Sequence, residues 1–157
     1  MTAGTRPTWD DVWLSVADSV ARRSRCARAQ IGAAIVSKDQ HIAATGYNGP
    51  AASWPHDDEC GRWCPRAQGT TPLGANYDEC PAIHAEANAL MYVDRSRVDG
   101  GTIYVTSAVC MNCAKLISNS GLRRVVMRIR DEDQHREPEK VIEYLRRCKI
   151  VVVIDNA

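Results

Sequence analysis

The sequence predicts an α/β fold in which helices cover both faces of a five-stranded mixed sheet. Two observations lead to this prediction. After an N-terminal helical segment and a hairpin, runs rich in β-branched residues alternate with segments of helical period, which gives the order α-β-β-α-β-α-β-α-β. The chain has 157 residues, which is enough for one domain with a substantial core. We therefore expect residues 1–157 to form a single domain.

The N-terminal part predicts a helix followed by a β-hairpin. Thr8 is a suitable N-cap, and two aspartates follow it in the first turn, where the helix dipole favours negative charge. Valines recur every fourth residue over residues 12–20, which indicates an amphipathic helix that ends near Arg23. Residues 31–37 and 41–46 are two apolar runs joined by a polar turn, which is typical of a hairpin.

The hairpin leads into a Gly-Tyr-Asn-Gly loop at residues 46–49, whose two glycines permit unusual backbone angles. Two interpretations of Asn48 stay open. The loop is either a turn that closes the strand, or a segment whose Asn48 side chain faces a ligand.

Residues of about 50–81 form an irregular loop insert with several prolines and glycines and no sustained periodicity. A loop of this length in a compact domain is usually functional or anchored by other contacts. One interpretation is a second, structural zinc site, because thiols and imidazoles are zinc ligands. The alternative is a set of buried or unused thiols. The candidate ligands are Cys26, His56, Cys60, Cys64 and Cys80.

The C-terminal half predicts three further helices and three further strands. Gly121 is suited to end the second of these helices, because glycine adopts the left-handed backbone conformation at helix ends. Residues 130–137 are charged, and we expect them to be exposed. In order, the predicted elements are helix 81–94, strand 102–106, helix 110–120, strand 123–129, helix 138–148 and strand 149–154.

Two short motifs contain the residues suited to catalysis. His84 and Glu86 stand two residues apart in a predicted helix, and Cys110 and Cys113 share one face of another helix start. One imidazole and two thiolates suit zinc, and a catalytic zinc keeps three protein ligands with a fourth position for water. Glu86 then remains free to move protons. The alternatives for these residues are a structural zinc site or a redox-active dithiol.

Composition excludes several classes of function. Lys and Arg number 20 against 19 Asp and Glu, so no net field favours a nucleic-acid polymer. No apolar run approaches the roughly 20 residues of a membrane span. Seven cysteines without a secretion signal favour a reduced, cytoplasmic location and metal ligation over disulfide bonds.

With these motifs in view, the sequence resembles the deoxycytidylate (dCMP) deaminases of the cytidine deaminase superfamily. The resemblance extends from about Trp9 to Ile154. It implies a cytidine-deaminase-like three-layer α/β/α sandwich, and zinc-dependent hydrolytic deamination of dCMP to dUMP and ammonia. The segments that carry it are residues 24–28, 31–33, 46–49, 84–89, 104–106, 110–115 and 120–126.

The resemblance also implies a role for each candidate site residue. His84, Cys110 and Cys113 would hold the zinc, and Glu86 would act as the catalytic acid and base. Val109 stands where the family usually has proline, which removes stiffness but no ligand. The substrate contacts that the resemblance implies are Asn48 near the sugar and the backbone from Thr106 to Ala108 at the amino group. The phosphate needs a cation, and four arginines cluster near the loop that we expect to face the site, of which we select Arg28; the others are Arg22, Arg23 and Arg25.

Relatives in this family imply further partners. They are often homo-hexamers, and deoxynucleoside triphosphates with Mg²⁺ regulate them. We therefore expect a homo-oligomer that acts on a small nucleotide, without a nucleic-acid polymer or a membrane as partner.

Two other functions remain open. Residues 127–137 contain no Phe, Tyr or Trp, although the family usually places a base-stacking aromatic there. Met127, His135, or Trp54 or Trp63 of the insert could cover the ring instead. The first alternative is therefore a deaminase of modified dCMP, dCTP, a nucleoside or a free base. The second is a non-catalytic, zinc-stabilised binding module, which would tend to close the metal shell with four ligands.

Overall fold

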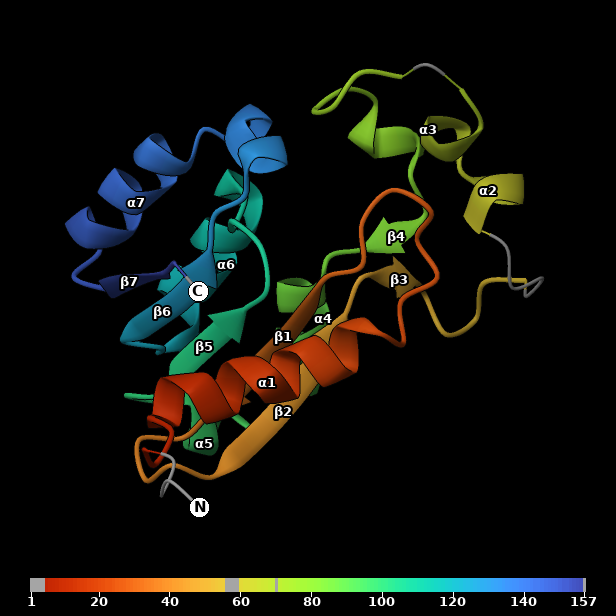
Figure 1. The fold of residues 1–157 in the computed structure, drawn as a ribbon. Coiled ribbons are helices and arrows are strands. Elements are labelled where there is room, and N and C mark those ends of the chain that lie inside the picture. The colour runs from red at the N-terminus through yellow and green to blue at the C-terminus, as the bar shows by residue number, and fades with distance from the viewer. Residues whose placement is uncertain (1–4, 56–59, 70, 157) are drawn as a thin grey trace.

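The computed structural model describes residues 5–55, 60–69 and 71–156, and it contains the expected five-stranded mixed sheet (Figure 1). The strand order is β2-β1-β5-β6-β7. β1 runs antiparallel to both β2 and β5, whereas β5, β6 and β7 are parallel. The strands are β1 (Gly32–Val36), β2 (Ile42–Tyr47), β5 (Thr102–Val105), β6 (Arg124–Arg128) and β7 (Val151–Asp155).

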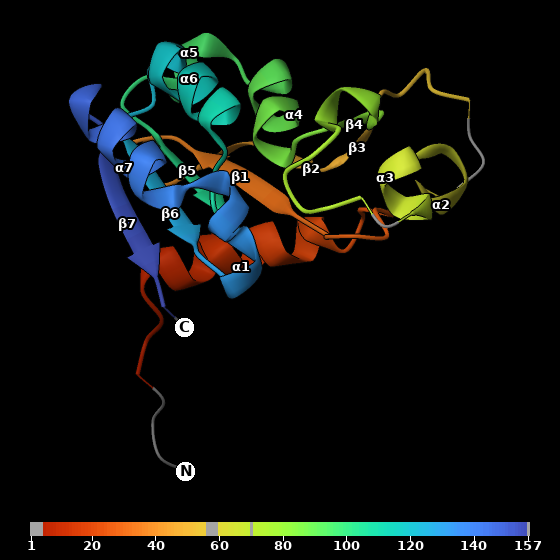
Figure 2. The same cartoon turned by 90° about the horizontal axis from the view of Figure 1, so that it is seen from above.

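Helices cover both faces of this sheet, which confirms the three-layer prediction (Figure 2). On one face, α1 (Trp9–Ala21) buries Leu14 and Ala17 against strand residues such as Val126. On the other face, α4, α6 and α7 cover the larger core. Their bounds are α4 (Ala85–Tyr92), α6 (Met111–Ser120) and α7 (Pro138–Arg147). No helix in the described part of the chain is long and apolar enough to cross a membrane.

The N-terminal helix begins as the sequence predicts. The Thr8 side chain accepts a hydrogen bond from the Asp11 backbone N–H, and the Asp11 carboxylate accepts one from the Thr8 backbone N–H at 2.7 Å. This reciprocal capping box satisfies two donors that the first turn of a helix leaves free.

Gly46 lets α4 approach the sheet closely. A Cβ atom at Gly46 would lie 2.2 Å from the Ala85 carbonyl oxygen, so only glycine fits between β2 and α4. Neither Gly46 nor Gly49 has a positive φ, so the loop does not use the left-handed backbone conformation that its glycines permit. The close contact matters for function, since α4 begins directly after His84.

The region before α4 differs from the prediction of one helix over residues 81–94. Ala82 and Ile83 form β4 (Ala82–Ile83), which pairs antiparallel with β3 (Gly49–Pro50). This pairing keeps the backbone extended, so α4 starts only at Ala85 and His84 becomes its N-cap residue. A short helix, α5 (Arg95–Val98), then follows.

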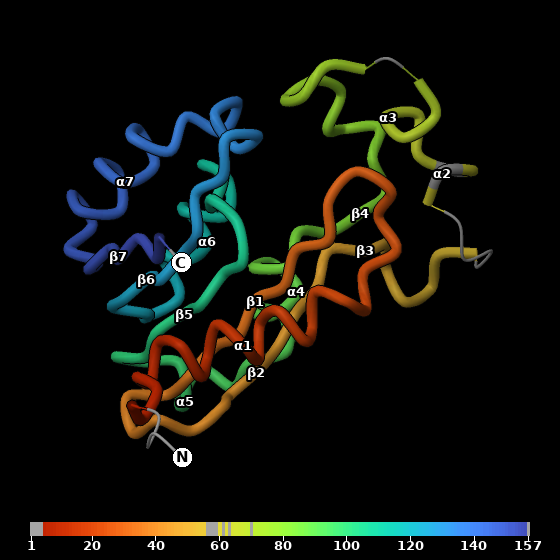
Figure 3. The backbone as a smooth tube through the Cα atoms, viewed as in Figure 1, coloured from red at the N-terminus to blue at the C-terminus, as the bar shows by residue number. Residues whose placement is uncertain are grey.

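The insert between β3 and β4 is less irregular than predicted. It contains α2 (Cys60–Trp63), α3 (Pro65–Gln68) and the 3₁₀ turn η1 (Tyr77–Glu79). Figure 3 shows its path away from β3 and back into β4. Because the paired strands hold both ends of the insert together, its short helices lie at the end of the sheet that carries the site.

Residues 130–137 were wrongly predicted to be uniformly exposed. Asp131–Arg136 form the 3₁₀ helix η2, and Asp133 is only 3% exposed. The Asp133 carboxylate accepts hydrogen bonds from the Ser107 hydroxyl, the Ala108 N–H and the Arg130 N–H. Burial of this charge is possible because three donors satisfy it.

Candidate active site

Three side chains that could hold a metal ion meet where α4 and α6 begin. His84 is the N-cap residue of α4, Cys110 is the N-cap residue of α6, and Cys113 lies in the first turn of α6. Their ligand atoms all lie within 4.8 Å of one another. The His84 Nδ1 atom is 3.4 Å from the Cys110 Sγ atom and 3.5 Å from the Cys113 Sγ atom. The structure thus brings together the three residues that the sequence singled out.

These separations fit a zinc ion. With Zn–S near 2.3 Å and Zn–N near 2.0–2.1 Å, a tetrahedral ion separates a sulfur and a nitrogen ligand by about 3.6 Å. One nitrogen and two sulfur donors are also the donor types that zinc prefers. Three protein donors leave a fourth position for water.

The electrostatics of the cluster favour a negatively charged sulfur. The pKa of Cys110 is lowered to about 3, chiefly because Cys113 and then His84 hydrogen-bond to its thiolate. The pKa of His84 is raised, mainly through its hydrogen bond with Cys110. The pKa of Cys113 is raised, because its hydrogen bond to Cys110 holds its own proton in place. A divalent cation would replace these protons, since thiolate is the metal-binding form.

Glu86 lies beside this cluster and is 2% exposed. Its Oε1 atom has no hydrogen-bond partner. Burial is the largest cause of its raised pKa, and the nearby His84 opposes that shift. A buried carboxyl group with a raised pKa can both accept and release a proton near neutral pH.

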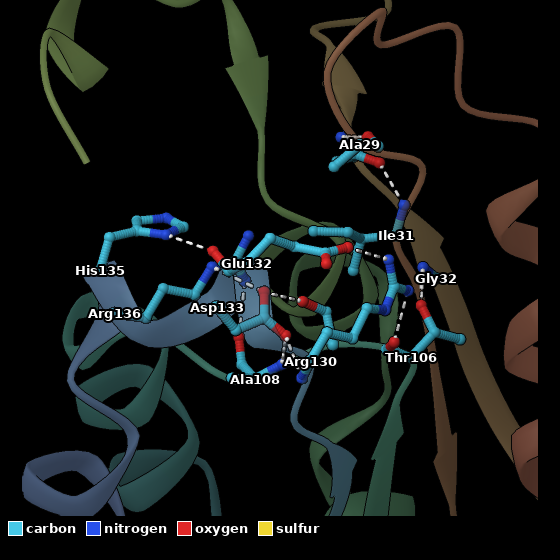
Figure 4. A network of polar contacts seen from close by, with 12 residues as sticks. Ala29, Ile31, Gly32, Thr106, Ala108, Arg130, Glu132, Asp133, His135 and Arg136 are labelled. Atoms are coloured by element: carbon cyan, nitrogen blue, oxygen red, sulfur yellow. Dashed lines mark hydrogen bonds and ion pairs between the residues drawn. The ribbon is translucent and has the colours of Figure 1, made fainter. Parts of the chain in front are cut away.

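A cavity of about 270 Å³ opens above these residues. Its walls come from parts of the chain that are far apart in sequence. The insert contributes Arg66 and Tyr77, η2 contributes Asp133 and His135, and Glu86 lies at the α4 end. Figure 4 shows the η2 side of this wall and its contacts with residues 106–108.

Asn48 lines the cavity, but its amide also holds the backbone together. Its Oδ1 atom accepts a hydrogen bond from the Ile31 N–H, and its Nδ2 atom donates to the Ala29 carbonyl, both at 2.8 Å. The side chain is 7% exposed. The structure therefore combines the two interpretations left open above, since Asn48 both fixes a turn and faces the cavity.

The backbone from Thr106 to Ala108 is engaged by η2 (Figure 4). The Thr106 carbonyl accepts a hydrogen bond from Arg130 at 2.7 Å, and the Ala108 carbonyl accepts one from Arg136 at 2.6 Å. The Thr106 hydroxyl accepts one from the Gly32 N–H. These contacts fix the segment that leads into Cys110.

Arg28 lines the cavity, and its side chain also hydrogen-bonds to the backbone of the insert. Its Nη1 atom donates to the carbonyl oxygens of Arg66 at 2.7 Å and Thr71 at 3.0 Å. The neighbouring Arg22 and Arg23 are exposed and do not line the cavity. The local sequence could not distinguish Arg28 from these two arginines, because the partners of Arg28 lie about 40 residues away in the chain.

The candidates for a second zinc are only partly brought together. Cys60 lies near Cys26 and Cys64, and its pKa is raised to about 11, chiefly by burial. Cys80 interacts with Cys64, and burial is again the main cause of its raised pKa. Among the described residues, however, only the His84 cluster holds three ligand atoms that are all mutually close. His56, the remaining candidate, lies outside the described residues.

Tyr77 contributes an aromatic ring to the cavity, and no sequence pattern predicted it. Its ring lies edge-on to the His84 ring, with centroids 5.8 Å apart. Its hydroxyl is 3.0 Å from the His135 Nε2 atom, so the insert and η2 meet across the cavity. No spacing rule could have found Tyr77, because a non-periodic insert delivers it.

The other groups considered for covering a substrate ring differ in position. Met127 is fully buried, and its sulfur accepts a hydrogen bond from the Val109 N–H at 3.4 Å. Trp54 is not among the described residues that line the cavity, and the Trp63 side chain lies outside the description. His135 does line the cavity.

Comparison with known sequences identifies related proteins. The family model for the cytidine and deoxycytidylate deaminase zinc-binding region matches residues 7–129. The chain is 43% identical to the deoxycytidylate deaminase of Mycobacterium phage D29 over 126 residues, which cover 78% of this chain and 95% of the phage protein. It is 34% identical to the deoxycytidylate deaminase of Schizosaccharomyces pombe over 77% of this chain but only 37% of the yeast protein.

Comparison with solved structures also finds deoxycytidylate deaminases. The fold is similar to the dCMP deaminase of cyanophage S-TIM5 in complex with dCMP and dUMP, with a TM-score of 0.70 and 25% identity. The match covers 97% of this chain and all of the phage chain. The part matched by the family model includes the three donors and Glu86 but ends before η2.

Proposed function

The chain belongs to the cytidine and deoxycytidylate deaminase family, and we propose that it catalyses the zinc-dependent hydrolytic deamination of dCMP to dUMP and ammonia. One observation carries the proposal. A three-donor zinc cluster and a buried, unpartnered carboxyl group share one cavity, which is the arrangement that hydrolytic deamination of an amino-substituted ring requires. We further propose that the chain acts as one catalytic unit with residues 50–81 as an insert.

We assign the metal to His84, Cys110 and Cys113. When bound, zinc acts as a Lewis acid that lowers the pKa of a coordinated water to about 7. The chain holds its three donors at the starts of two packed helices, so their positions are rigid. Three protein donors would leave one position of the ion for water, and Glu86 lines the same cavity as His84.

Glu86 moves the protons in this mechanism. Its carboxylate takes a proton from the attacking water and delivers it to N3 of the cytosine ring as the new C4–O bond forms. It then transfers the remaining hydroxyl proton to the amino group, and the C4–N bond breaks to release ammonia. Water thus supplies both protons and the oxygen, so Glu86 ends in its initial state.

Substrate contacts are assigned from the walls of the cavity. Asn48, which lines the cavity, contacts the sugar. The backbone from Thr106 to Ala108, of which Ser107 lines the cavity, reads the amino group. Arg28 holds the insert in place, since its Nη1 atom donates to two carbonyl oxygens. Its place in the cavity wall keeps it a candidate for the phosphate, beside any cation whose donors have fewer partners within the chain.

Tyr77 supports a pyrimidine substrate. The alternative of another amino-ring substrate depended on the missing aromatic after β6, and Tyr77 supplies an aromatic face in the cavity from the insert. The binding-module alternative is disfavoured, because a structural metal site closes its shell, whereas this site has three donors and a free carboxyl group.

A second metal ion, the oligomeric state, the regulation and the cellular location remain predictions. The thiols of Cys26, Cys60, Cys64 and Cys80 support a second, structural zinc, because Cys60 and Cys80 each adjoin Cys64. Elemental analysis that finds two zinc ions per chain would support it. We also keep the homo-hexamer, regulation by deoxynucleoside triphosphates with Mg²⁺, and the cytoplasmic location as predictions. Light scattering with and without dCTP and Mg²⁺ tests the first two.

The decisive experiment measures ammonia release by the zinc-loaded protein. The substrates are dCMP, cytidine, dCTP, 5-methyl-dCMP and guanine. Preference for dCMP supports the proposal. Turnover of another ring without turnover of dCMP would keep the zinc chemistry and replace the substrate, whereas zinc binding without any turnover would favour the binding module.

A further inference from the structure

Arg66 is a buried cation in the cavity without a full set of partners. It is 7% exposed and lines the cavity, and its Nε atom is buried without a hydrogen-bond partner. A buried charged group that lacks hydrogen bonds is strongly disfavoured unless a ligand completes it. Arg66 therefore has an unmet requirement for an acceptor inside the cavity.

The insert holds this guanidinium in a defined position. Its central carbon lies 3.9 Å from the centroid of the Tyr77 ring, which is a cation–π contact. The Arg66 carbonyl is bound by Arg28, and the Tyr77 hydroxyl is bound by His135. Both the backbone and the stacking partner of Arg66 are thus anchored by residues outside the insert.

Tyr77 also connects Arg66 to the metal cluster. The Tyr77 ring contacts the Arg66 guanidinium on its face, and its centroid lies 5.8 Å from that of the His84 ring. Arg66 and His84 are therefore separated by roughly one aromatic ring. A nucleotide that presents its amino group at His84 has its phosphate at the opposite end of the molecule, where a cation is needed.

The other arginines of the cavity already have acceptors. Arg28 donates to two insert carbonyls. Arg130 donates to the Thr106 carbonyl and pairs with Glu132 at 3.5 Å. Arg136 donates to the Ala108 carbonyl, and its Nε atom, although it also lacks a hydrogen-bond partner, lies 3.6 Å from the Asp133 carboxylate. Among the described arginines that line the cavity, Arg66 therefore has the clearest need for a ligand.

We propose that Arg66 binds the 5′-phosphate of the substrate and makes the enzyme select a nucleotide over a nucleoside. The inference deepens the function proposed above and rests on it. The planar guanidinium can donate two parallel hydrogen bonds to phosphate oxygens, which lysine cannot reproduce. Arg66 is thus a specificity-determining residue supplied by the insert.

The test compares the holoenzyme with Arg66→Gln, Arg66→Lys and the control Arg23→Gln, which alters an exposed arginine outside the cavity. We expect Arg66→Gln to lower kcat/KM for dCMP about 10- to 150-fold, the range of a hydrogen bond to a charged group. It should leave kcat/KM for deoxycytidine within about twofold of wild type. For Arg66→Lys, kcat/KM for dCMP should lie between the values of wild type and Arg66→Gln, and kcat/KM for deoxycytidine should not change.

Equal losses with dCMP and deoxycytidine would overturn the inference. That result, especially with loss of zinc by elemental analysis, would instead assign Arg66 to supporting the insert and its thiols, since it lies near Cys80. If Arg66→Gln fails to fold, Arg66→Lys decides the matter by the same comparison.

Binding separates failure of this inference from failure of the proposed function. Calorimetry with dUMP and deoxyuridine measures how far wild type prefers the phosphorylated ligand. No preference in wild type would reject the nucleotide substrate itself. A strong preference that Arg66→Gln fully retains would reject the role of Arg66 alone.

Discussion

Two polar clusters on opposite faces of the same sheet differ in how many of their polar atoms have hydrogen-bond partners. Beneath α1, Asp10 accepts hydrogen bonds from Arg124 at 2.6 and 2.8 Å and from the Tyr104 hydroxyl at 3.0 Å. We call these three residues the α1 cluster. In the described part of the chain, three buried side-chain atoms lack a hydrogen-bond partner, and they belong to Glu86, Arg66 and Arg136 of the cavity.

The difference separates a structural site from a binding site. The α1 cluster finds its acceptors and donors within the chain, so it contributes to stability and needs no ligand. Each unsatisfied group in the cavity disfavours folding by about 1–3 kcal/mol. Proteins retain such groups where function requires them, because the substrate or its transition state completes them.

The largest expected effect comes from removing a metal donor. Cys113→Ala should lose zinc and lower turnover to background while the fold persists, because three donors at a catalytic site serve reactivity more than folding. Elemental analysis, ammonia release and circular dichroism measure the three properties. Cys148→Ala is the matched control, since Cys148 lies at the end of α7 away from the cavity. Retention of full zinc by Cys113→Ala would contradict the assigned donors.

Glu86→Gln should give the next largest effect. We expect kcat to fall about 10²- to 10⁴-fold with zinc retained, because an amide cannot shuttle the protons. Thermal stability should not fall, since the change removes a buried carboxyl group that has no partner at Oε1. Glu139→Gln, at an exposed position of α7, is the control. Wild-type turnover by Glu86→Gln would reject the mechanism.

Asp10→Asn should show the opposite pattern. We expect the free energy of unfolding to fall by about 1–2 kcal/mol, because Arg124 loses its charged partner at a partly exposed site. The kinetic constants for dCMP should stay unchanged. Urea unfolding of Asp10→Asn, Arg124→Met and the double variant gives the coupling energy between the two side chains. A large loss of kcat would show that the α1 cluster also supports catalysis.

The smallest expected effect is the pH dependence of the α1 cluster. The hydrogen bond from Arg124 is the main cause that lowers the pKa of Asp10 below its ordinary value of 3.8. A lowered folded-state pKa stabilises the protein above the unfolded pKa, and this contribution disappears as the pH falls through the folded pKa. The stability difference between wild type and Asp10→Asn should therefore narrow below about pH 4 in urea unfolding. A constant difference down to pH 2.5 would contradict the lowered pKa.

Local patterns explain why much of the fold could be predicted. The helix 9–21, the hairpin, and the three strands and two helices β5, α6, β6, α7 and β7 follow from periodicity, N-caps and glycine at a helix end. These signals depend on neighbours within a few residues. The start of α4 was misplaced because Ala82 and Ile83 pair with β3, more than 30 residues earlier. Such a pairing leaves no local signal in a two-residue strand.

The sequence by itself determined the candidate metal donors and the fold class. His84, Cys110 and Cys113 stand at helix starts, and motifs of this kind are encoded by short spacings and by the alternation of strands and helices. Only the tertiary structure decided which polar groups are buried and which of them lack partners. Asp133 accepts hydrogen bonds from donors near residue 107, Arg28 donates to the insert, and the buried Arg66 Nε atom has no partner. Burial and hydrogen bonding depend on contacts between distant segments, so no local pattern could distinguish these residues.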